Sequence, residues 1–225
     1  METASQYFNA MVADYDSLIR RAVPRYDEML ARSIEYMPPR ADRVLELGCG
    51  TGNLTLRVAA RFPGAALTLV DGAGEMLELS RHRLAAAASS CAVTCVETTF
   101  ERVELQPASF DLVTSSISLH HVVEKPALFR RLFALLAPGG ALVYSDQMRG
   151  RTDAHHALNM DRMRDFWRES EPLSLDEQRS LDRHSDDHDH YVSVADQLAW
   201  LDAAGFADVD CVWRNWMWGV ITARA

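Results

Sequence analysis

The sequence lacks a long apolar run. No segment approaches the roughly 18 to 20 consecutive apolar residues of a membrane-spanning helix. The opening METASQYFNA also lacks the basic and apolar regions of a secretory signal. We therefore expect a cytoplasmic protein that does not bind a membrane.

An excess of positive charge is also missing. The 225 residues carry a net charge of -9, and the pI is near 5.3. Nucleic-acid backbones are bound by clustered lysine and arginine, whereas the basic group Arg20, Arg21 and Arg25 lies among acidic residues, as in a charge-paired helix. We expect no nucleic-acid partner. A homodimer is compatible with the sequence, which does not define the oligomeric state.

Cysteines at disulfide-framework or zinc-site spacing are absent as well. The four cysteines form no Cys-x-x-Cys pair, so in a reducing compartment they are expected to be small core residues. The run HSDDHDHY at residues 184–191 has the residue types of a metal site. Such runs are more often solvated loops, and the sequence therefore predicts no metal.

What the sequence does contain is an alternation of strand-like and helical segments. The strand-like stretches are 43–47, 66–71, 92–97, 110–116 and 140–146. This alternation predicts a parallel sheet with helices on both faces. Two further runs, 208–214 and 216–225, are expected to close the sheet as an antiparallel hairpin. The predicted fold class is α/β, with a Rossmann-like, mostly parallel, seven-stranded sheet.

Two helical stretches lie outside this alternation. Residues 1–40 are mostly helical in pattern. Residues 147–192 contain two helical segments, the second opened by a capping box at Ser174 and Glu177. We expect a single domain over residues 1–225, in which 1–40 lies over a cofactor and 147–192 is a helical cap insertion over an acceptor pocket.

Three glycines follow the first strand, in VLELGCGTGN. Gly48, Gly50 and Gly52 lie where a strand turns into a helix, and without Cβ atoms they let a ligand approach the backbone. A pyrophosphate-binding turn would have another glycine three residues after Gly50, where this chain has Asn53. The dinucleotide pattern therefore fails, which disfavours a nicotinamide-dependent dehydrogenase.

Carboxylates accompany this glycine loop. Asp71 ends the second strand, 19 residues after Gly52, where it can accept hydrogen bonds from both hydroxyls of a ribose. Glu46 adds an acceptor at the end of the first strand. Carboxylates repel phosphate but suit a ligand with a free ribose, a cationic amino group and a sulfonium. S-adenosylmethionine carries all three.

These segments resemble the class I S-adenosylmethionine-dependent methyltransferases. LELGCGTG is similar to their cofactor loop and LVDGAGEML to their ribose-binding segment, while FDLVTSSISLHHV and LLAPGGALVYSD are similar to segments around their fourth and fifth strands. The resemblance covers residues 43–146. It implies S-adenosylmethionine as the cofactor and a small-molecule methyl acceptor. The cofactor-binding residues that it implies are Tyr15, Arg20, Glu46, Gly48, Gly50, Asn53, Asp71, Gly72, Met76, Thr99, Phe100 and Ser115.

Methyl transfer from a sulfonium is an in-line displacement that mainly needs alignment and exclusion of water. A general base helps when the acceptor is protonated, and histidine has a suitable pKa. The resemblance implies that His120 faces the acceptor and is the catalytic residue. The alternative is that both histidines of LHHV are structural. The expected acceptor-binding residues are His121, Asp146, Gln147 and Trp167.

Two rival functions stay open at this point. One is a tRNA-nucleoside-modifying enzyme that uses S-adenosylmethionine or an altered form of it, which would need a basic path to the pocket. The other is a non-catalytic protein that binds the cofactor without turnover. The favoured prediction is a small-molecule methyltransferase, with nitrogen, oxygen, sulfur and carbon all open as the methylated atom.

Overall fold

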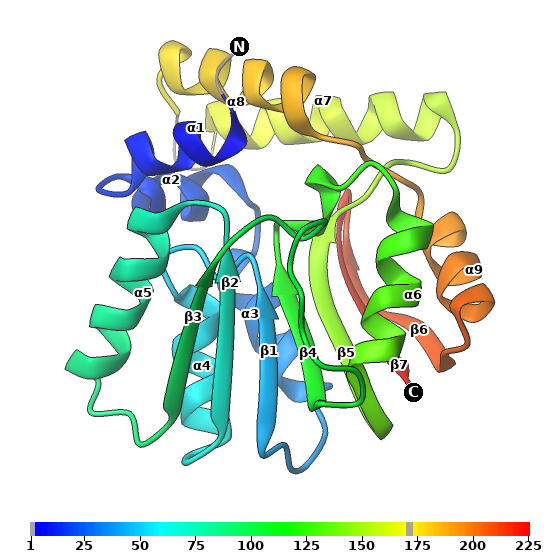
Figure 1. Ribbon diagram of the computed structural model, residues 1–225. Coiled ribbons are helices and arrows are strands. Elements are labelled where there is room, and N and C mark those ends of the chain that lie inside the picture. Colours follow the sequence, from blue (N-terminus) through cyan, green and yellow to red (C-terminus); the bar gives the residue numbers. More distant parts are fainter. Residues whose placement is uncertain (1–2, 170–172) are drawn as a thin grey trace.

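The computed structural model describes residues 3–169 and 173–225, and a seven-stranded sheet lies at its centre (Figure 1). The strands are β1 (Arg43–Leu47), β2 (Ala66–Asp71), β3 (Ala92–Glu97), β4 (Phe110–Ser116), β5 (Leu136–Gln147), β6 (Ala207–Asn215) and β7 (Trp218–Arg224). Their order is β3-β2-β1-β4-β5-β7-β6. Strands β1 to β5 are parallel, and β7 is antiparallel to both neighbours. The predicted fold class is confirmed.

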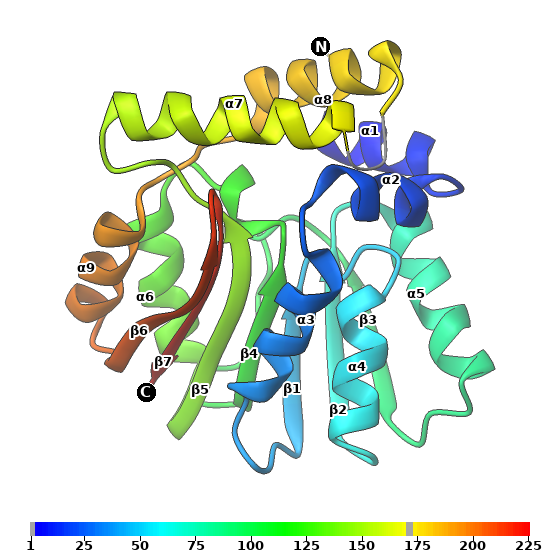
Figure 2. The same cartoon turned by 180° about the vertical axis from the view of Figure 1, so that it is seen from behind.

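Helices pack on both faces of the sheet (Figures 1 and 2). Side chains of α3 (Tyr26–Glu35), α4 (Asn53–Arg61) and α5 (Gly74–Ala86) form one core cluster with one sheet face, and those of α6 (Lys125–Leu135) and α9 (Val194–Ala204) form a second cluster with the other. Successive strand residues alternate between the clusters, because side chains of a strand point to opposite faces. In β1, Val44 belongs to the first and Leu45 to the second.

Strand boundaries differ from the prediction mainly at β5 and in the hairpin. Strand β5 begins at Leu136, four residues before the expected start, because it follows directly on α6. The β6–β7 turn consists of Trp216 and Met217, and Trp216 has a left-handed φ of 53°. The hairpin therefore turns inside the expected second run, at its first two residues.

The N-terminal helical stretch is broken into three helices. These are α1 (Ala4–Met11), α2 (Tyr15–Ala22) and α3. Pro24 and Arg25, with a φ of 62° at Arg25, separate α2 from α3. This break lets α3 pack on the sheet face while α1 and α2 lie over the carboxyl ends of the strands (Figures 1 and 2).

Two further helices lie across the same edge of the sheet, α7 (Asp153–Glu169) and α8 (Leu175–His188) (Figures 1 and 2). The expected capping box opens α8, with the Glu177 amide donating to Ser174 Oγ at 3.2 Å and the Ser174 amide donating to Glu177 Oε2 at 2.7 Å. Helix α8 continues to His188, so most of the run 184–191 is helical rather than a loop.

The cysteines differ in burial more than we expected. All four are free thiols, but only Cys49 is fully buried, whereas Cys95 is exposed on the edge strand β3. Over residues 3–169 and 173–225, no helix is long and apolar enough to cross a membrane.

Candidate active site

A cavity of about 250 Å³ opens at the carboxyl end of β1, beside the glycine loop. Its walls come from that loop, the end of β2, the turn after β4, and helices α1 and α2. Ten of the twelve residues predicted to bind the cofactor line it, namely Tyr15, Glu46, Gly48, Gly50, Asn53, Asp71, Gly72, Met76, Thr99 and Phe100.

The glycine loop depends on backbone that only glycine adopts easily. Gly48 has a φ of 65°, and a Cβ placed on it would lie 2.3 Å from Ser118 Oγ and 3.2 Å from the Phe100 ring. Both neighbours line the cavity. The Gly48 amide donates to the Val70 carbonyl at 2.7 Å, which ties the loop to β2. A side chain here would push the cavity walls apart.

Asp71 is held in place by two backbone amides. The Gly50 amide donates to Oδ2 and the Ala73 amide to Oδ1, both at 2.8 Å. Burial raises the pKa of Asp71, and these backbone hydrogen bonds counteract the rise. Each carboxylate oxygen has a further lone pair, so the side chain is oriented to accept hydrogen bonds from a diol in the cavity.

Glu46 is a buried carboxyl group on the cavity wall. Its side chain is 2% exposed, and Oε2 has no hydrogen-bond partner among the described residues. Burial raises the pKa of Glu46, and a hydrogen bond from Thr55 lowers it by less, so that the pKa is about 8. In the free protein Glu46 is therefore protonated at pH 7, and a cationic ligand would favour its ionised form.

We expect the stability of the free protein to fall between pH 5 and pH 7.5 relative to a Glu46→Gln variant. The unfolded carboxyl ionises near the ordinary glutamate pKa of 4.5, whereas the folded one holds its proton to about pH 8. The folded state thus binds more protons in this window, and stability falls as pH rises. The wild type should lose roughly 2–3 kcal/mol relative to the variant.

Urea denaturation of both proteins at each pH measures this difference. The test is how the difference in unfolding free energy between the two proteins changes with pH. Its absolute value is not used, because the glutamine amide adds a cost that does not depend on pH. A parallel pH dependence of wild type and variant would contradict a protonated Glu46.

Arg20 does not line the cavity. Its guanidinium donates to the Asp16 carbonyl at 2.9 Å and lies 3.7 Å from Asp27 Oδ2, with the side chain 43% exposed. The reason is helical periodicity, because the buried face of α2 carries Leu18, Ile19 and Ala22.

Arg83 of α5 is the basic residue beside the glycine loop. Its Nη1 donates to the Thr51 carbonyl and to Asp16 Oδ2, each at 2.9 Å. Asp16 in turn accepts from the Thr51 hydroxyl and the Asn53 amide, so Arg83 braces α2 against the loop. The sequence reasoning missed it because its partners, Asp16 and residues 51–53, lie in two segments far from it in sequence.

Ser115 also lies outside the cavity lining. It pairs with Leu47 in the sheet, and its hydroxyl donates to the Leu47 carbonyl at 2.8 Å. The cavity is lined instead by the next three residues, Ser116, Ile117 and Ser118. The cofactor contact of Ser115 stays a prediction, and Ser115 precedes the lining residues by one position.

A second cavity, of about 100 Å³, lies between the first and the helices α7 and α8. His120, Gln147 and Trp167, all predicted to meet the acceptor, line it. It shares Phe8, Tyr15 and Ile117 with the first cavity, so these residues form the boundary between the two. The other two predicted acceptor residues are placed differently, since His121 lines the first cavity and Asp146 lines neither.

His120 is oriented by Asp146. Its Nδ1 lies 2.5 Å from Asp146 Oδ1, and the ring is 4% exposed. Burial lowers the pKa of His120, but the charge and hydrogen bond of Asp146 outweigh this, and the pKa is raised overall. With Nδ1 engaged, Nε2 is the nitrogen left to act on a ligand. It lies 3.4 Å from Asp189 Oδ1.

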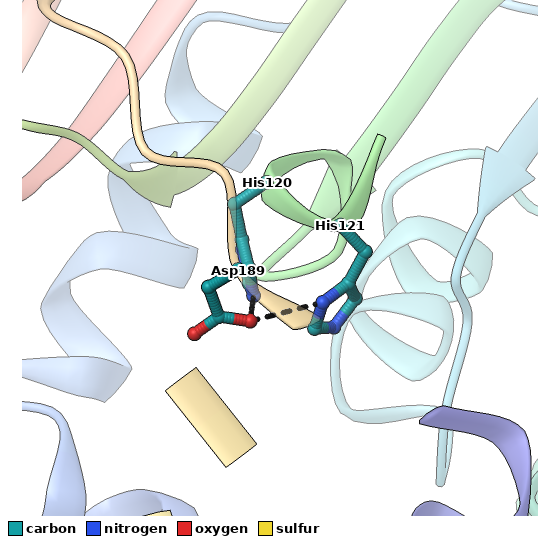
Figure 3. A group of neighbouring side chains, drawn as sticks. All are labelled: His120, His121 and Asp189. Carbon is teal, nitrogen blue, oxygen red and sulfur yellow. Dashed lines mark ion pairs between the residues drawn. The ribbon is translucent and has the colours of Figure 1, made fainter. Parts of the chain in front are cut away.

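Asp189 is the main site residue that sequence reasoning missed. Figure 3 shows its carboxylate between the rings of His120 and His121, which belong to the turn after β4, while Asp189 follows α8. His121 Nδ1 lies 3.0 Å from Asp189 Oδ1. The available signal was the spacing of Leu181, His184 and His188, which continues the helix that begins at Leu175.

Lys125, the single lysine of the sequence, fastens the same region. Its Nζ donates to the carbonyls of Val122 at 2.7 Å and His190 at 2.5 Å, with His120 at 3.3 Å. The residue is 3% exposed, and burial lowers its pKa. It therefore joins the turn after β4 to the segment after α8.

The charged side chains that line the two cavities are acidic, unlike those of an anion-binding site. Within the described part of the chain, neither lining contains an arginine or a lysine. The first includes Glu46, Asp71 and Glu101, and the second includes Asp182 and Asp189. This arrangement favours cationic or neutral ligands over phosphates and carboxylates.

Comparison with known proteins points to one enzyme family. Residues 44–140 match the family model described as a methyltransferase domain. The chain is 31% identical to a carboxy-S-adenosyl-L-methionine synthase of Chromohalobacter salexigens, over 70% of this chain and 60% of that protein. It is 29% identical to the ubiquinone/menaquinone biosynthesis C-methyltransferase UbiE of Geotalea daltonii (63% and 62%). For the trans-aconitate 2-methyltransferase of Paracidovorax citrulli the identity is 35% (58% and 48%). The matches thus span less than two thirds of each of these relatives.

Solved structures share the fold. A phosphoethanolamine N-methyltransferase 2 of Haemonchus contortus, in complex with S-adenosyl-L-methionine, superposes with a TM-score of 0.71 at 17% identity, covering 98% of this chain and 58% of that one. An S-adenosylmethionine-dependent methyltransferase of Mesorhizobium loti superposes with a TM-score of 0.62 at 21% identity, covering 92% and 100%. At these identities the likeness concerns the fold alone.

Proposed function

Because the chain belongs to the class I S-adenosylmethionine-dependent methyltransferase family, we propose that it transfers a methyl group from S-adenosylmethionine to a small-molecule acceptor. The observation that carries this proposal is Asp71. Its carboxylate is fixed by the amides of Gly50 and Ala73 at the edge of the first cavity, in the orientation that a ribose diol needs.

In this proposal the two cavities hold the two reactants. The cofactor occupies the first, with Glu46 available to the cationic methionine part, and α1 and α2 cover it. The methyl group crosses to the second cavity between Phe8, Tyr15 and Ile117. Because the transfer needs a linear approach and a dry site, these three apolar or aromatic side chains serve alignment and exclusion of water.

The acceptor that fits the second cavity is small and either neutral or cationic. No arginine or lysine lines this cavity in the described residues, whereas Tyr7, Phe8, Trp167 and Trp218 supply aromatic surface. Aromatic faces and carboxylates attract amines and other cations. Helices α7 and α8 act as the cap over this acceptor.

His120 is the proposed proton acceptor. Asp146 holds Nδ1 at 2.5 Å, which fixes the ring and leaves Nε2 for a protonated acceptor. A carboxylate that orients a histidine in this way also stabilises the imidazolium formed on proton transfer. The raised pKa of His120 strengthens it as a base.

An enzyme that makes a carboxylated S-adenosylmethionine is the second candidate, favoured by the resemblance to carboxy-S-adenosyl-L-methionine synthases. Such an activity needs an anionic co-substrate to be held beside the cofactor, and among the described residues the lining of the second cavity contains no arginine or lysine that would do so. The net charge of -9 likewise disfavours a tRNA substrate. Mass spectrometry of the cofactor after incubation with candidate acceptors separates the two reactions.

We also place the protein in the cytoplasm and treat residues 1–225 as one domain. The four free cysteines support a reducing compartment. The boundary residues shared by both cavities support a single unit in which the N-terminal helices and the cap work on one site.

Calorimetric titration with S-adenosylhomocysteine, beside NAD, tests the proposed function. We expect saturable binding of S-adenosylhomocysteine alone. Asp71→Ala should weaken it by about 1–3 kcal/mol, or roughly 5- to 150-fold, because the ribose hydroxyls lose their acceptor.

Asp42→Ala provides the control, since Asp42 is a surface carboxylate paired with Arg40 at the far end of β1. Its affinity should equal that of the wild type. Binding of NAD, or of neither ligand, would overturn the cofactor assignment. Equal affinity of Asp71→Ala and wild type would remove Asp71 from the site.

A further inference from the structure

One oxygen of Asp189 lies among three imidazole nitrogens. His121 Nδ1 is 3.0 Å from Oδ1 and His120 Nε2 is 3.4 Å from it. His184 Nε2, from α8, is 3.8 Å away. Nevertheless Oδ1 makes no hydrogen bond of normal geometry within residues 3–169 and 173–225, and neither ring nitrogen of His184 makes one. Three imidazole rings therefore converge on one carboxylate oxygen, and His121 Nδ1 lies in addition 3.4 Å from the His188 carbonyl.

These separations match the spacing of ligands around a small cation. Zinc binds histidine nitrogen and carboxylate oxygen at about 2.0–2.2 Å, so neighbouring ligand atoms in a tetrahedral site lie about 3.3 Å apart. The ligand atoms of His120, His121 and Asp189 all lie within 4.8 Å of one another. Figure 3 shows the two rings and the carboxylate directed at one another.

Outer contacts orient these ligands as they do in metal sites. Asp146 binds His120 Nδ1, which turns Nε2 toward Asp189, and the Tyr191 hydroxyl donates to the other Asp189 oxygen, Oδ2. Ligating histidines commonly have a carboxylate on their second nitrogen, and ligating carboxylates are themselves hydrogen-bonded. Both features are present here without serving the cofactor cavity.

We propose that His120 Nε2, His121 Nδ1 and Asp189 Oδ1 form a binding site for a zinc-class divalent metal ion. Two histidines and one carboxylate leave a coordination position open. His120, His184 and Asp189 line the second cavity, so the open position faces that cavity.

The consequence for catalysis rests on the proposed function. An acceptor in the second cavity would bind the ion through its oxygen, nitrogen or sulfur, and coordination would lower the pKa of that group. His120 would then act as a ligand instead of a proton acceptor, and the proton released by the coordinated group would go to solvent water. The site also joins the segment after α8 to the turn after β4, so ion binding would hold the cap closed.

Titration of tag-free, chelator-treated protein with Co²⁺ tests the site through visible absorption, which is intense for four-coordinate cobalt and weak for six-coordinate cobalt. We expect intense bands that saturate at one equivalent and are displaced by Zn²⁺. Asp189→Asn, which keeps the shape of the side chain, should weaken binding by more than 100-fold. Tyr191→Phe, an outer-contact change, should weaken it by about 10- to 100-fold.

His190→Ala is the matched control, because this exposed histidine is adjacent to Asp189 and contacts the site only through its backbone. It should bind Co²⁺ as the wild type does. Unchanged binding in Asp189→Asn, or no saturable four-coordinate spectrum in the wild type, would overturn the proposal. Titration of the same chelator-treated proteins with S-adenosylhomocysteine checks that they are folded. If the cofactor assignment is wrong, this titration shows no binding, whereas the Co²⁺ result is unaffected.

Discussion

A Gly48→Ala variant is expected to lose roughly 2–5 kcal/mol of unfolding free energy. The left-handed φ of 65° costs an L-residue about 1–2 kcal/mol. The new Cβ would also lie 2.3 Å from Ser118 Oγ and 2.4 Å from Ser118 Cβ, and overpacking of this kind costs about 1–3 kcal/mol. Urea denaturation measures the loss, and the thermal midpoint should fall by roughly 5–15 °C.

Gly64→Ala separates the two causes. Gly64 has a φ of 83°, but a Cβ there would meet no atom within 4 Å. It should therefore show the cost of the backbone conformation alone, about 1–2 kcal/mol. If the two variants were equally stable, the close approach of Gly48 to Ser118 would play no part. We also expect weaker S-adenosylhomocysteine binding in Gly48→Ala only, because Ser118 and Phe100 line the cofactor cavity.

Trp167→Ala should release helices α7 and α8 from the rest of the protein. The indole is 8% exposed, and its Nε1 donates to the Ala22 carbonyl at 2.8 Å. Trp167 and Met163 are the buried residues of α7, and α8 has none within its described length. Loss of a buried tryptophan costs about 3–5 kcal/mol. Because α7 and α8 lie over the ends of the strands and not against a sheet face, the cost should appear as local opening rather than global unfolding (Figures 1 and 2).

Hydrogen exchange measured by mass spectrometry checks this expectation. Amides of α7 and α8 should exchange at least about 100-fold faster in Trp167→Ala, whereas strands β1 and β4 should change little. Leu158→Ala is the control, since Leu158 is an apolar residue of α7 that is 48% exposed. Uniformly faster exchange throughout the sheet would mean that Trp167 belongs to the global core instead.

The strands could be predicted because each carries its own signal. Runs such as Val44–Leu47, apolar except for Glu46, are buried on both faces, which makes the buried positions continuous rather than alternating. Asp71 and the glycine loop could be placed from the sequence because each lies at the end of a recognisable strand. Arg20 was assigned from its position in the sequence alone. In the structure it lies on the face of α2 opposite Leu18, Ile19 and Ala22, which are buried, and outside the cavity lining.

The residues around the second cavity could be predicted only in part. His120 and Trp167 follow recognisable elements, but the position of Asp189 depends on how far α8 extends and where the chain returns. His184 and Asp189 lie more than 60 residues from His120 in sequence and meet it only through tertiary packing. From sequence alone, the run of histidines and aspartates at 184–191 is expected to be a solvated loop. Its burial follows only once the extent of α8 and its packing against the turn after β4 are known.

The position of Lys125 limits how this chain can be modified after synthesis. It is the only lysine in the sequence, so the other 22 basic side chains are arginines, whose guanidinium groups are not acetylated or ubiquitinated as amines are. Its ammonium group is enclosed by the carbonyls of Val122 and His190. Enzymes that act on lysine side chains therefore have a single target in this chain, and it becomes accessible only when the segment after α8 separates from the turn after β4.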